Sequence, residues 1–216
     1  MVVMADNAKS HGGGRDEVEF RGLVARTSGV QPWRRVLHAL TGCLIAAAVV
    51  VSGVPPSAVA GALGGVLVLL VVLDSVRLRS PRLNAAFFRL FRSLASPREA
   101  ERAVSGSWYV AGAALALALF PRQAAVAGIL VLALADPAAH TFGRRYGKIR
   151  LGKGTLEGSL AFFCVALGVA LLTVPVPAAL AAAVAATLVE PLPLALDDNL
   201  TIPLAGAAAV VLAQAV

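Results

Sequence analysis

A stretch of 38 consecutive residues, 36–73, contains no Asp, Glu, Lys or Arg. In soluble domains about a quarter of the residues are charged, so a stretch of this length does not form a water-exposed surface. About 20 apolar residues cross the hydrocarbon core of a bilayer as a single helix. The motif Gly53-Val-Pro-Pro-Ser57 interrupts the stretch near its middle. The sequence therefore predicts two membrane-spanning helices, near 36–53 and 56–74.

The remaining sequence repeats this pattern of apolar segments separated by polar ones. Hydrophobic residues make up 58% of the 216 residues, and charged residues only 14%. The apolar segments lack the alternation of a membrane β-barrel, so we expect an all-α, polytopic membrane helix bundle. About seven transmembrane helices are predicted, because further apolar segments lie near 106–120, 123–140, 159–174, 178–190 and 200–216. Residues 1–31 are expected to form a disordered tail, and residues 32–216 a membrane-embedded domain.

Basic residues are distributed unevenly between the predicted loops. With seven spans, 18 of the 19 Lys and Arg residues fall on one side of the membrane, and only Arg122 falls on the other. Loops rich in Lys and Arg stay in the cytoplasm. We therefore expect the N-terminus and any active site to face the cytoplasm, and the C-terminus to lie on the opposite side. This asymmetry accounts for the net charge of +7, so no nucleic-acid partner is expected.

The basic loop 75–105 contains apolar residues at helical spacing with arginines between them. This pattern predicts an amphipathic helix that lies in the headgroup layer. Such a helix serves either as a membrane anchor or as the rim of an entrance for a lipid substrate. Its predicted apolar face consists of Leu83, Phe87, Leu90, Phe91 and Leu94.

The polar segment 136–159 carries most of the candidate chemistry. It places five basic residues and five glycines between two apolar spans. Asp136 lies about 20 Å along its predicted span, at a rise of 1.5 Å per residue. An ionisable side chain at the inner edge of the hydrocarbon is costly and is therefore a functional candidate. Because Pro137 follows, Asp136 could instead be the N-cap of a new helix.

Small residues follow Asp136 along one helical stripe and allow the backbone to approach either another helix or a ligand. Members of the stripe are Asp136, Ala139, Gly143 and Gly147. The next residues offer cations and hydroxyl groups that suit phosphate oxygens. These residues are Lys148, Arg150, Lys153, Thr155 and Ser159.

The order of these residues resembles the CTP-binding signature of the dolichol kinase family. That family groups polyprenol kinases, phytol kinases and CTP-dependent diacylglycerol kinases, and it is related to the phosphatidate cytidylyltransferases. The matching positions are Asp136, Ala139, Gly143, Gly147, Lys153, Thr155, Glu157, Gly158 and Ser159. The sequence departs from the family in a shorter spacer after Gly147, and in having Lys153-Gly154 where two lysines are frequent.

Further matches follow in the order of the family between about residues 34 and 204. They are the segments Arg34–Gly42, Asp74–Arg77, Arg98–Glu101, Gly106–Tyr109 and Asp197–Pro203. The resemblance adds candidate site residues outside the polar segment. These are Arg35, His38, Asp74, Arg77, Arg98, Glu101 and Asn199.

The resemblance implies a CTP-dependent lipid-alcohol kinase that uses Mg²⁺. The acceptor would be the hydroxyl group of a dolichol-like or phytol-like prenol, or of diacylglycerol. The expected nucleotide-binding residues are Gly143, Arg144, Gly147, Lys148, Arg150, Lys153, Gly154, Thr155, Gly158 and Ser159. The expected catalytic residues are Asp136, Glu157 and His38. The candidate metal ligands are Asp136, Asp197 and Asp198, because Mg²⁺ takes few carboxylates when phosphate oxygens supply other ligands.

Several alternatives remain open at this point. Asp197, Asp198 and Asn199 could each cap the last span, and Asn199 is favoured. Glu190 before Pro191 is either a second carboxylate at the membrane edge or a helix terminator. A phosphatidate cytidylyltransferase would use the same nucleotide. A transporter or membrane scaffold is the non-enzymatic alternative. The sequence argues against a transporter, because it has no evident inverted repeat and no ionisable residue in mid-span apart from the region of His38.

Overall fold

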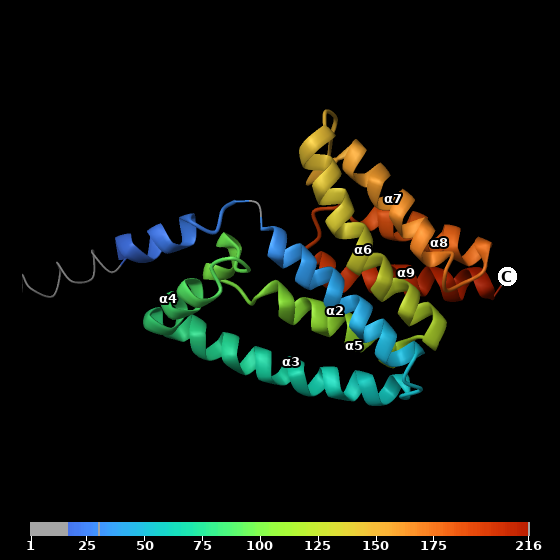
Figure 1. The fold of residues 1–216 in the computed structure, drawn as a ribbon, viewed down its shortest axis with the longest axis horizontal. Helices are drawn as coiled ribbons and strands as arrows, with labels where there is room; N and C mark the ends of the chain where they lie inside the picture. Colours follow the sequence, from blue (N-terminus) through green and yellow to red (C-terminus); the bar gives the residue numbers. More distant parts are fainter. Residues whose placement is uncertain (1–16, 30, 216) are drawn as a thin grey trace, which may run out of the picture. The chain divides into compact units, whose positions relative to one another are not determined.

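A computed structural model describes residues 17–29 and 31–215 of the chain. Residues 17–25 are helical, and the elements that follow are shown in Figure 1. In chain order they are α2 (Pro32–Val50), α3 (Pro56–Arg79), α4 (Pro81–Leu90), the 3-10 turn η1 (Pro97–Ala100), α5 (Ser105–Leu119), α6 (Arg122–Tyr146), β1 (Arg150–Leu151), β2 (Gly154–Thr155), α7 (Leu156–Ala170), α8 (Val176–Val189) and α9 (Asp198–Gln214). The described residues are therefore predominantly α-helical, as predicted.

Two local features differ from the prediction. The hairpin of β1 and β2 is a small antiparallel sheet that pairs Arg150 with Thr155 and Leu151 with Gly154. The tail predicted for residues 1–31 contains a helix at 17–25. The part of that prediction that concerns residues 1–16 and 30 lies outside the described residues.

Three helices in the described part of the chain are long and apolar enough to cross a membrane. They are α2, α3 and α6. Each of the other predicted spans also corresponds to a helix, but α5 and α7 have only 15 residues and α8 has 14. A 15-residue helix is about 22 Å long, which is shorter than a hydrocarbon core of about 30 Å. The structure thus supports a membrane protein with three spans by length and composition, while seven spans and their orientation stay predictions.

The chain divides into two compact units. The first contains the described residues up to Arg34 together with Val71–Val104, and the second contains Arg35–Leu70 and the chain from Ser105 onwards.

In the first unit, α4 confirms the predicted helix but buries a different residue. Phe88 is fully buried, and its ring meets those of Phe20 and Phe87 edge-on, with centroids 5.7 and 5.3 Å apart. Leu83 and Leu90 of the predicted apolar face are 48% and 77% exposed. The helix therefore packs into the unit through Phe88 and leaves apolar side chains on its surface, while its location in the headgroup layer stays a prediction.

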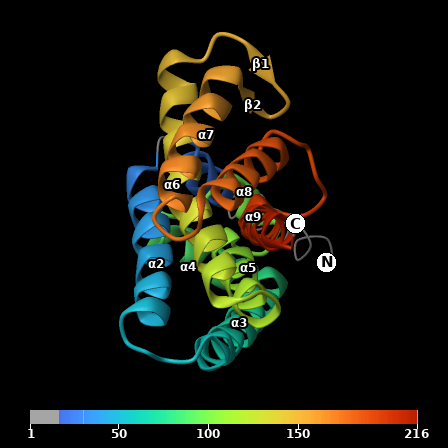
Figure 2. The ribbon, with the colours of Figure 1, turned by 90° about the vertical axis from the view of Figure 1, so that its right-hand side faces the viewer.

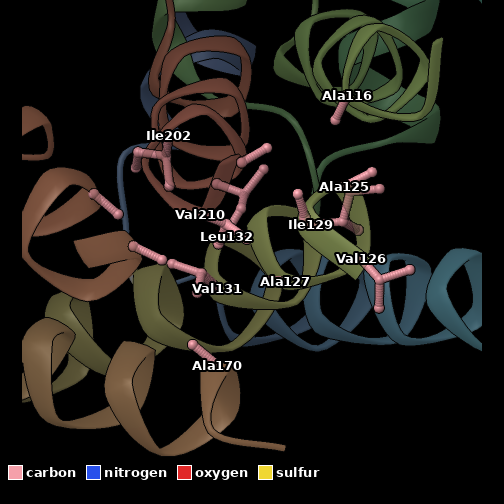
Figure 3. Packing of buried hydrophobic residues seen from close by; sticks show 14 of the residues in the cluster. Ala116, Ala125, Val126, Ala127, Ile129, Val131, Leu132, Ala170, Ile202 and Val210 are labelled. Carbon is pink, nitrogen blue, oxygen red and sulfur yellow. The ribbon is translucent and has the colours of Figure 1, made fainter. Parts of the chain in front are cut away.

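In the second unit, α6 is the central helix and packs against α5, α7 and α9, while α8 packs against α7 and α9. The core is built from small aliphatic residues, and Figure 3 shows Leu132 of α6 near Val210 of α9. Small residues let helix backbones approach closely. A Cβ atom on Gly128 would lie 2.2 Å from the backbone oxygen of Pro203. This close packing fixes the position of α6, the helix that carries Asp136.

Candidate functional site

Helix α6 passes through Pro137 without interruption and ends at Tyr146. A proline in a helix interior costs about 3 kcal/mol, because its ring clashes with the preceding turn and it lacks an N–H donor. The packing of α6 against α7 and α9 offsets this cost. Asp136 therefore lies within a helix, and the interpretation of Asp136 as an N-cap is wrong.

Asp136 is half-buried and lies among residues from three helices. It interacts electrostatically with Arg35 of α2 and with Tyr109 of α5. The hydroxyl group of Tyr109 donates a hydrogen bond to the backbone oxygen of His38 at 3.1 Å. The rings of Tyr109 and His38 also meet edge-on, with centroids 4.4 Å apart. The structure thus brings together Arg35, His38 and Asp136, all three of which the sequence predicts as site residues.

Tyr109 was not predicted as a site residue. The signal for it was the aromatic position at the end of Gly106–Tyr109, which the family motif shares. Arg144, in the last turn of α6, is exposed and also interacts electrostatically with Arg35. Arg35 thus interacts both with the positive charge of Arg144, near the end of a membrane-length helix, and with the negative charge of Asp136 on the same helix.

The predicted phosphate-binding glycines lie at the contact between α6 and α7. A Cβ atom on Gly143 would lie 3.0 Å from Oγ1 of Thr155, and one on Gly158 would lie 3.0 Å from the backbone oxygen of Ala139. On Gly147 it would lie 2.6 Å from Cγ2 of Thr155. These contacts support the helix-packing alternative for the small-residue stripe. A contact between these glycines and a nucleotide stays a prediction.

Thr155 also fixes the start of α7. Its side chain is the N-cap of the helix, because Oγ1 accepts a hydrogen bond from the backbone N–H of Gly158 at 3.2 Å. The hydroxyl group expected to meet phosphate is thus engaged with the backbone of its own helix.

The hairpin of β1 and β2 lies at one end of α6 and α7, as Figure 2 shows. The side chains of Lys148 and Arg150 are exposed before its turn. Lys153, in the turn, forms an ion pair with Asp198. The predicted cations therefore lie on one short loop, and the structure ties one of them to a carboxylate from α9.

Glu157 holds the loop before the hairpin close to the start of α7. Its carboxylate accepts a hydrogen bond from the backbone N–H of Ile149 at 3.4 Å. Its own backbone N–H and that of Lys148 hold the pKa of Glu157 below its ordinary value, and the charge of Lys148 acts in the same direction. Glu157 is therefore held in its ionised form, and its carboxylate orients this loop.

The carboxylates near α9 have separate partners. Asp197 is the N-cap of α9, because its side chain accepts hydrogen bonds from the backbone N–H and Nδ2 of Asn199 at 3.0 and 2.7 Å. The cap of α9 is therefore Asp197, one of the three residues considered from the sequence, and not Asn199, which the sequence favoured. Asp198 pairs with Lys153. Glu190, which directly follows α8, accepts a hydrogen bond from Oγ of Ser159 at 3.0 Å.

Glu190 is half-buried beside other charged groups. Burial raises the pKa of Glu190 above its ordinary value, and the negative charge of Asp198 adds to this shift. The hydrogen bond from Ser159 and the positive charge of Lys153 oppose the rise in pKa. Glu190 thus caps the end of α8, as one of the two sequence alternatives expected, and lies among charged groups; its position at the membrane edge stays a prediction.

Among residues 17–29 and 31–215 there is no group of three or more His, Cys, Asp or Glu side chains that could hold a metal ion. Mg²⁺ commonly binds one or two carboxylates, with phosphates and waters as its other ligands. Asp198 now pairs with Lys153. If a phosphate replaced Asp198 as the partner of Lys153, the carboxylate oxygens of Asp198 would fit this role. Asp197 fits less well, since its carboxylate is engaged in capping α9.

The first unit holds other predicted residues in a buried network. The guanidinium of Arg77 donates to Oδ1 of Asp74 at 2.8 Å, and Oδ2 of Asp74 accepts from the backbone N–H of Val104 at 3.0 Å. Both residues are 6% exposed. Arg77 also donates to the side chain of Asn84 and to the backbone oxygens of Glu99 and Arg102. The structure therefore supports a structural role for Asp74 and Arg77, which together hold the loop before α5.

Arg98 and Glu101 lie exposed on that loop, and the buried acid is Glu99. Glu99 pairs with Arg34 at 3.4 Å and closes a capping box with Ser96. The spacing Ser96-Pro-Arg-Glu99 is a sequence signature of such a box and could have identified Glu99.

The chain is similar to two proteins named CTP-dependent diacylglycerol kinase 1. The one from Saccharomyces cerevisiae is 30% identical over 102 residues, which cover 45% of this chain and 35% of the relative. The one from Eremothecium gossypii is 32% identical over 98 residues, which cover 44% and 31%. The match spans about a third of the length of these relatives. No family model matches the chain, and no solved structure matches it.

Proposed function

We propose that this chain is a membrane-embedded phosphotransferase that uses CTP to phosphorylate the hydroxyl group of a lipid. The names of the two relatives support CTP as donor and diacylglycerol as the first acceptor to test. One structural observation carries the proposal. Asp136 is half-buried on a membrane-length helix and interacts electrostatically with Arg35, and the same helix leads directly into the loop that bears Lys148, Arg150 and Lys153.

In the proposed reaction, the lipid hydroxyl oxygen attacks the γ-phosphorus of CTP. The bond between this phosphorus and the oxygen that bridges to the β-phosphorus breaks, and CDP leaves. Asp136 accepts the hydroxyl proton, since a base for this step must lie within hydrogen-bond reach of the lipid hydroxyl. A carboxylate at the edge of the hydrocarbon meets that condition for a membrane lipid.

The cations supply the charge neutralisation on which phosphoryl transfer mainly depends. Lys148 and Arg150 are exposed and available to phosphate oxygens, and Arg144 lies near Arg35. Lys153 would exchange Asp198 for a phosphate. Mg²⁺, when bound, would neutralise charge on the β- and γ-phosphates, and Asp198 is the carboxylate proposed to hold it.

The acceptor and the donor are tested together with purified protein in lipid vesicles. Vesicles that contain diacylglycerol, phytol or a polyprenol are incubated with γ-labelled CTP or γ-labelled ATP. We expect label in the lipid with CTP and much less with ATP. Label in pyrophosphate instead would indicate cytidylyl transfer, and no label in any lipid would reject the proposal.

A further inference from the structure

The turn between β1 and β2 is docked on the segment that joins α8 to α9. The backbone N–H of Lys153 donates a hydrogen bond to the backbone oxygen of Pro191 at 3.2 Å. Gly152 has a φ of +54°, and a Cβ atom there would lie 2.0 Å from the same oxygen. The turn therefore reaches Pro191 only with glycine at position 152.

Side chains reinforce this docking on both sides of the turn. Lys153 pairs with Asp198. Oγ of Ser159, a side chain in the first turn of α7 on a residue only 5% exposed, donates to Oε2 of Glu190 at 3.0 Å. The other carboxylate oxygen of Glu190 would lie 3.6 Å from a Cβ atom on Gly154. Glu190 thus bonds to the helix that follows the hairpin and lies close to Gly154, the residue that follows Lys153.

We propose that Glu190 is a positioning residue for the nucleotide, which acts by fixing the hairpin turn that presents Lys153 to the phosphates. This inference rests on the proposed function and extends the site to the segment between α8 and α9. Glu190 acts through Ser159 and Gly154 and does not itself touch the nucleotide.

The physical reason is preorganisation. A lysine side chain loses much rotamer freedom when it is held against a phosphate, and each immobilised side chain weakens binding. A turn that is already fixed at Pro191 and Glu190 leaves only the side chain of Lys153 to be ordered. Loss of the Ser159–Glu190 hydrogen bond frees the start of α7 from the end of α8, and the turn becomes mobile before the nucleotide binds.

Steady-state kinetics of the full chain test the inference. Glu190→Ala is expected to raise the KM for CTP about 3- to 10-fold, the effect of one lost hydrogen bond, while the KM for the lipid is unchanged. Glu190→Gln keeps an acceptor oxygen for Ser159 and is expected to raise the KM for CTP less than the alanine variant does. Glu17→Ala, an exposed acid outside the site, is the control.

A merely structural role gives a different result, because partial unfolding lowers the amount of active protein and leaves both KM values unchanged. That outcome, or an equal rise in both KM values, would overturn the inference. Wild-type protein that fails to transfer phosphate from CTP would instead reject the proposed function, so the two failures are distinguishable.

Ser159→Ala supplies a second test that does not depend on the folding of a Glu190 variant. It removes the same hydrogen bond, so we expect a similar rise in the KM for CTP. The double variant should have the KM of the more affected single variant. The inference would be overturned if the double variant raised the KM for CTP by the product of the two single effects, or if Ser159→Ala left the KM for CTP unchanged.

Discussion

Lys153 in the hairpin turn forms an ion pair with Asp198 in the first turn of α9, 45 residues further along the chain. Both residues were predicted as site residues, one for phosphate and one for metal. Their side chains are 35% and 30% exposed, so a ligand can reach the pair from solvent. The ion pair joins the polar segment 136–159 to the C-terminal part of the chain.

Replacement of Lys153 tests its role toward phosphate. A hydrogen bond to a charged group contributes about 1.5–3 kcal/mol, so Lys153→Ala should raise the KM for CTP about 10-fold or more. Initial rates at varied CTP concentration measure this. Arg82 is an exposed arginine on α4, so Arg82→Ala removes one positive charge outside the site and is the matched control. An equal change in both variants would show that only net charge matters.

The turn itself is tested at Gly152. Alanine in the left-handed backbone region costs about 1–2 kcal/mol, and the Cβ atom would also meet Pro191. Gly152→Ala should therefore lower the unfolding temperature in detergent micelles and weaken CTP binding. Gly168 in α7 has open space around it, and alanine is the better helix former, so Gly168→Ala should lower neither the unfolding temperature nor the affinity for CTP. If Gly152→Ala binds CTP as the wild type does, the turn is not fixed at Pro191.

The buried pair in the first unit predicts a large effect on stability. Arg77→Ala leaves the carboxylate of Asp74 buried without the guanidinium, which should lower the free energy of unfolding by about 3–5 kcal/mol. Arg21 and Glu17 form an exposed pair with side chains 77% and 62% accessible. Arg21→Ala should therefore change stability by less than about 1 kcal/mol. Chemical unfolding of both variants measures the difference, and equal effects would contradict the structural role of Arg77.

The raised pKa of Glu190 predicts a pH dependence of stability. Burial favours the neutral carboxyl group, so the ionised form destabilises the folded state once the pH exceeds the raised pKa. Below the ordinary pKa of 4.5 the group is neutral in both states and this penalty is absent. Glu190→Gln should therefore gain stability relative to the wild type as the pH rises from below 4.5 to neutral. Unfolding midpoints across this pH range measure the gain, and a difference that shrinks with rising pH would contradict the prediction.

The helices could be predicted from the sequence because apolar side chains and proline or glycine punctuation are local signals. The two helices predicted from the charge-free stretch 36–73 lie close to the observed bounds of α2 and α3. The continuity of α6 through Pro137 could not be predicted. Proline is a local helix breaker, whereas the packing that sustains α6 comes from α7 and α9, which lie far along the chain.

The site was predicted by residue type, but the partners of these residues depend on tertiary contacts. The sequence identified Arg35, His38 and Asp136 separately. In the fold His38 of α2 contacts Tyr109 of α5, and Asp136 of α6 interacts electrostatically with both Tyr109 and Arg35. Glu190 was noted only because it precedes Pro191. Its bond to Ser159 depends on the contact between α7 and α8, for which neither segment carries a local signal.

The central claim is that Asp136 accepts the proton of a lipid hydroxyl during phosphoryl transfer from CTP. The most direct measurement compares wild-type protein with Asp136→Asn in diacylglycerol vesicles, with γ-labelled and α-labelled CTP in parallel. We predict γ-label in the lipid and α-label in CDP for the wild type, with kcat reduced about 100-fold or more in Asp136→Asn. Undiminished γ-label transfer in Asp136→Asn, or α-label in the lipid product of the wild type, would contradict the claim.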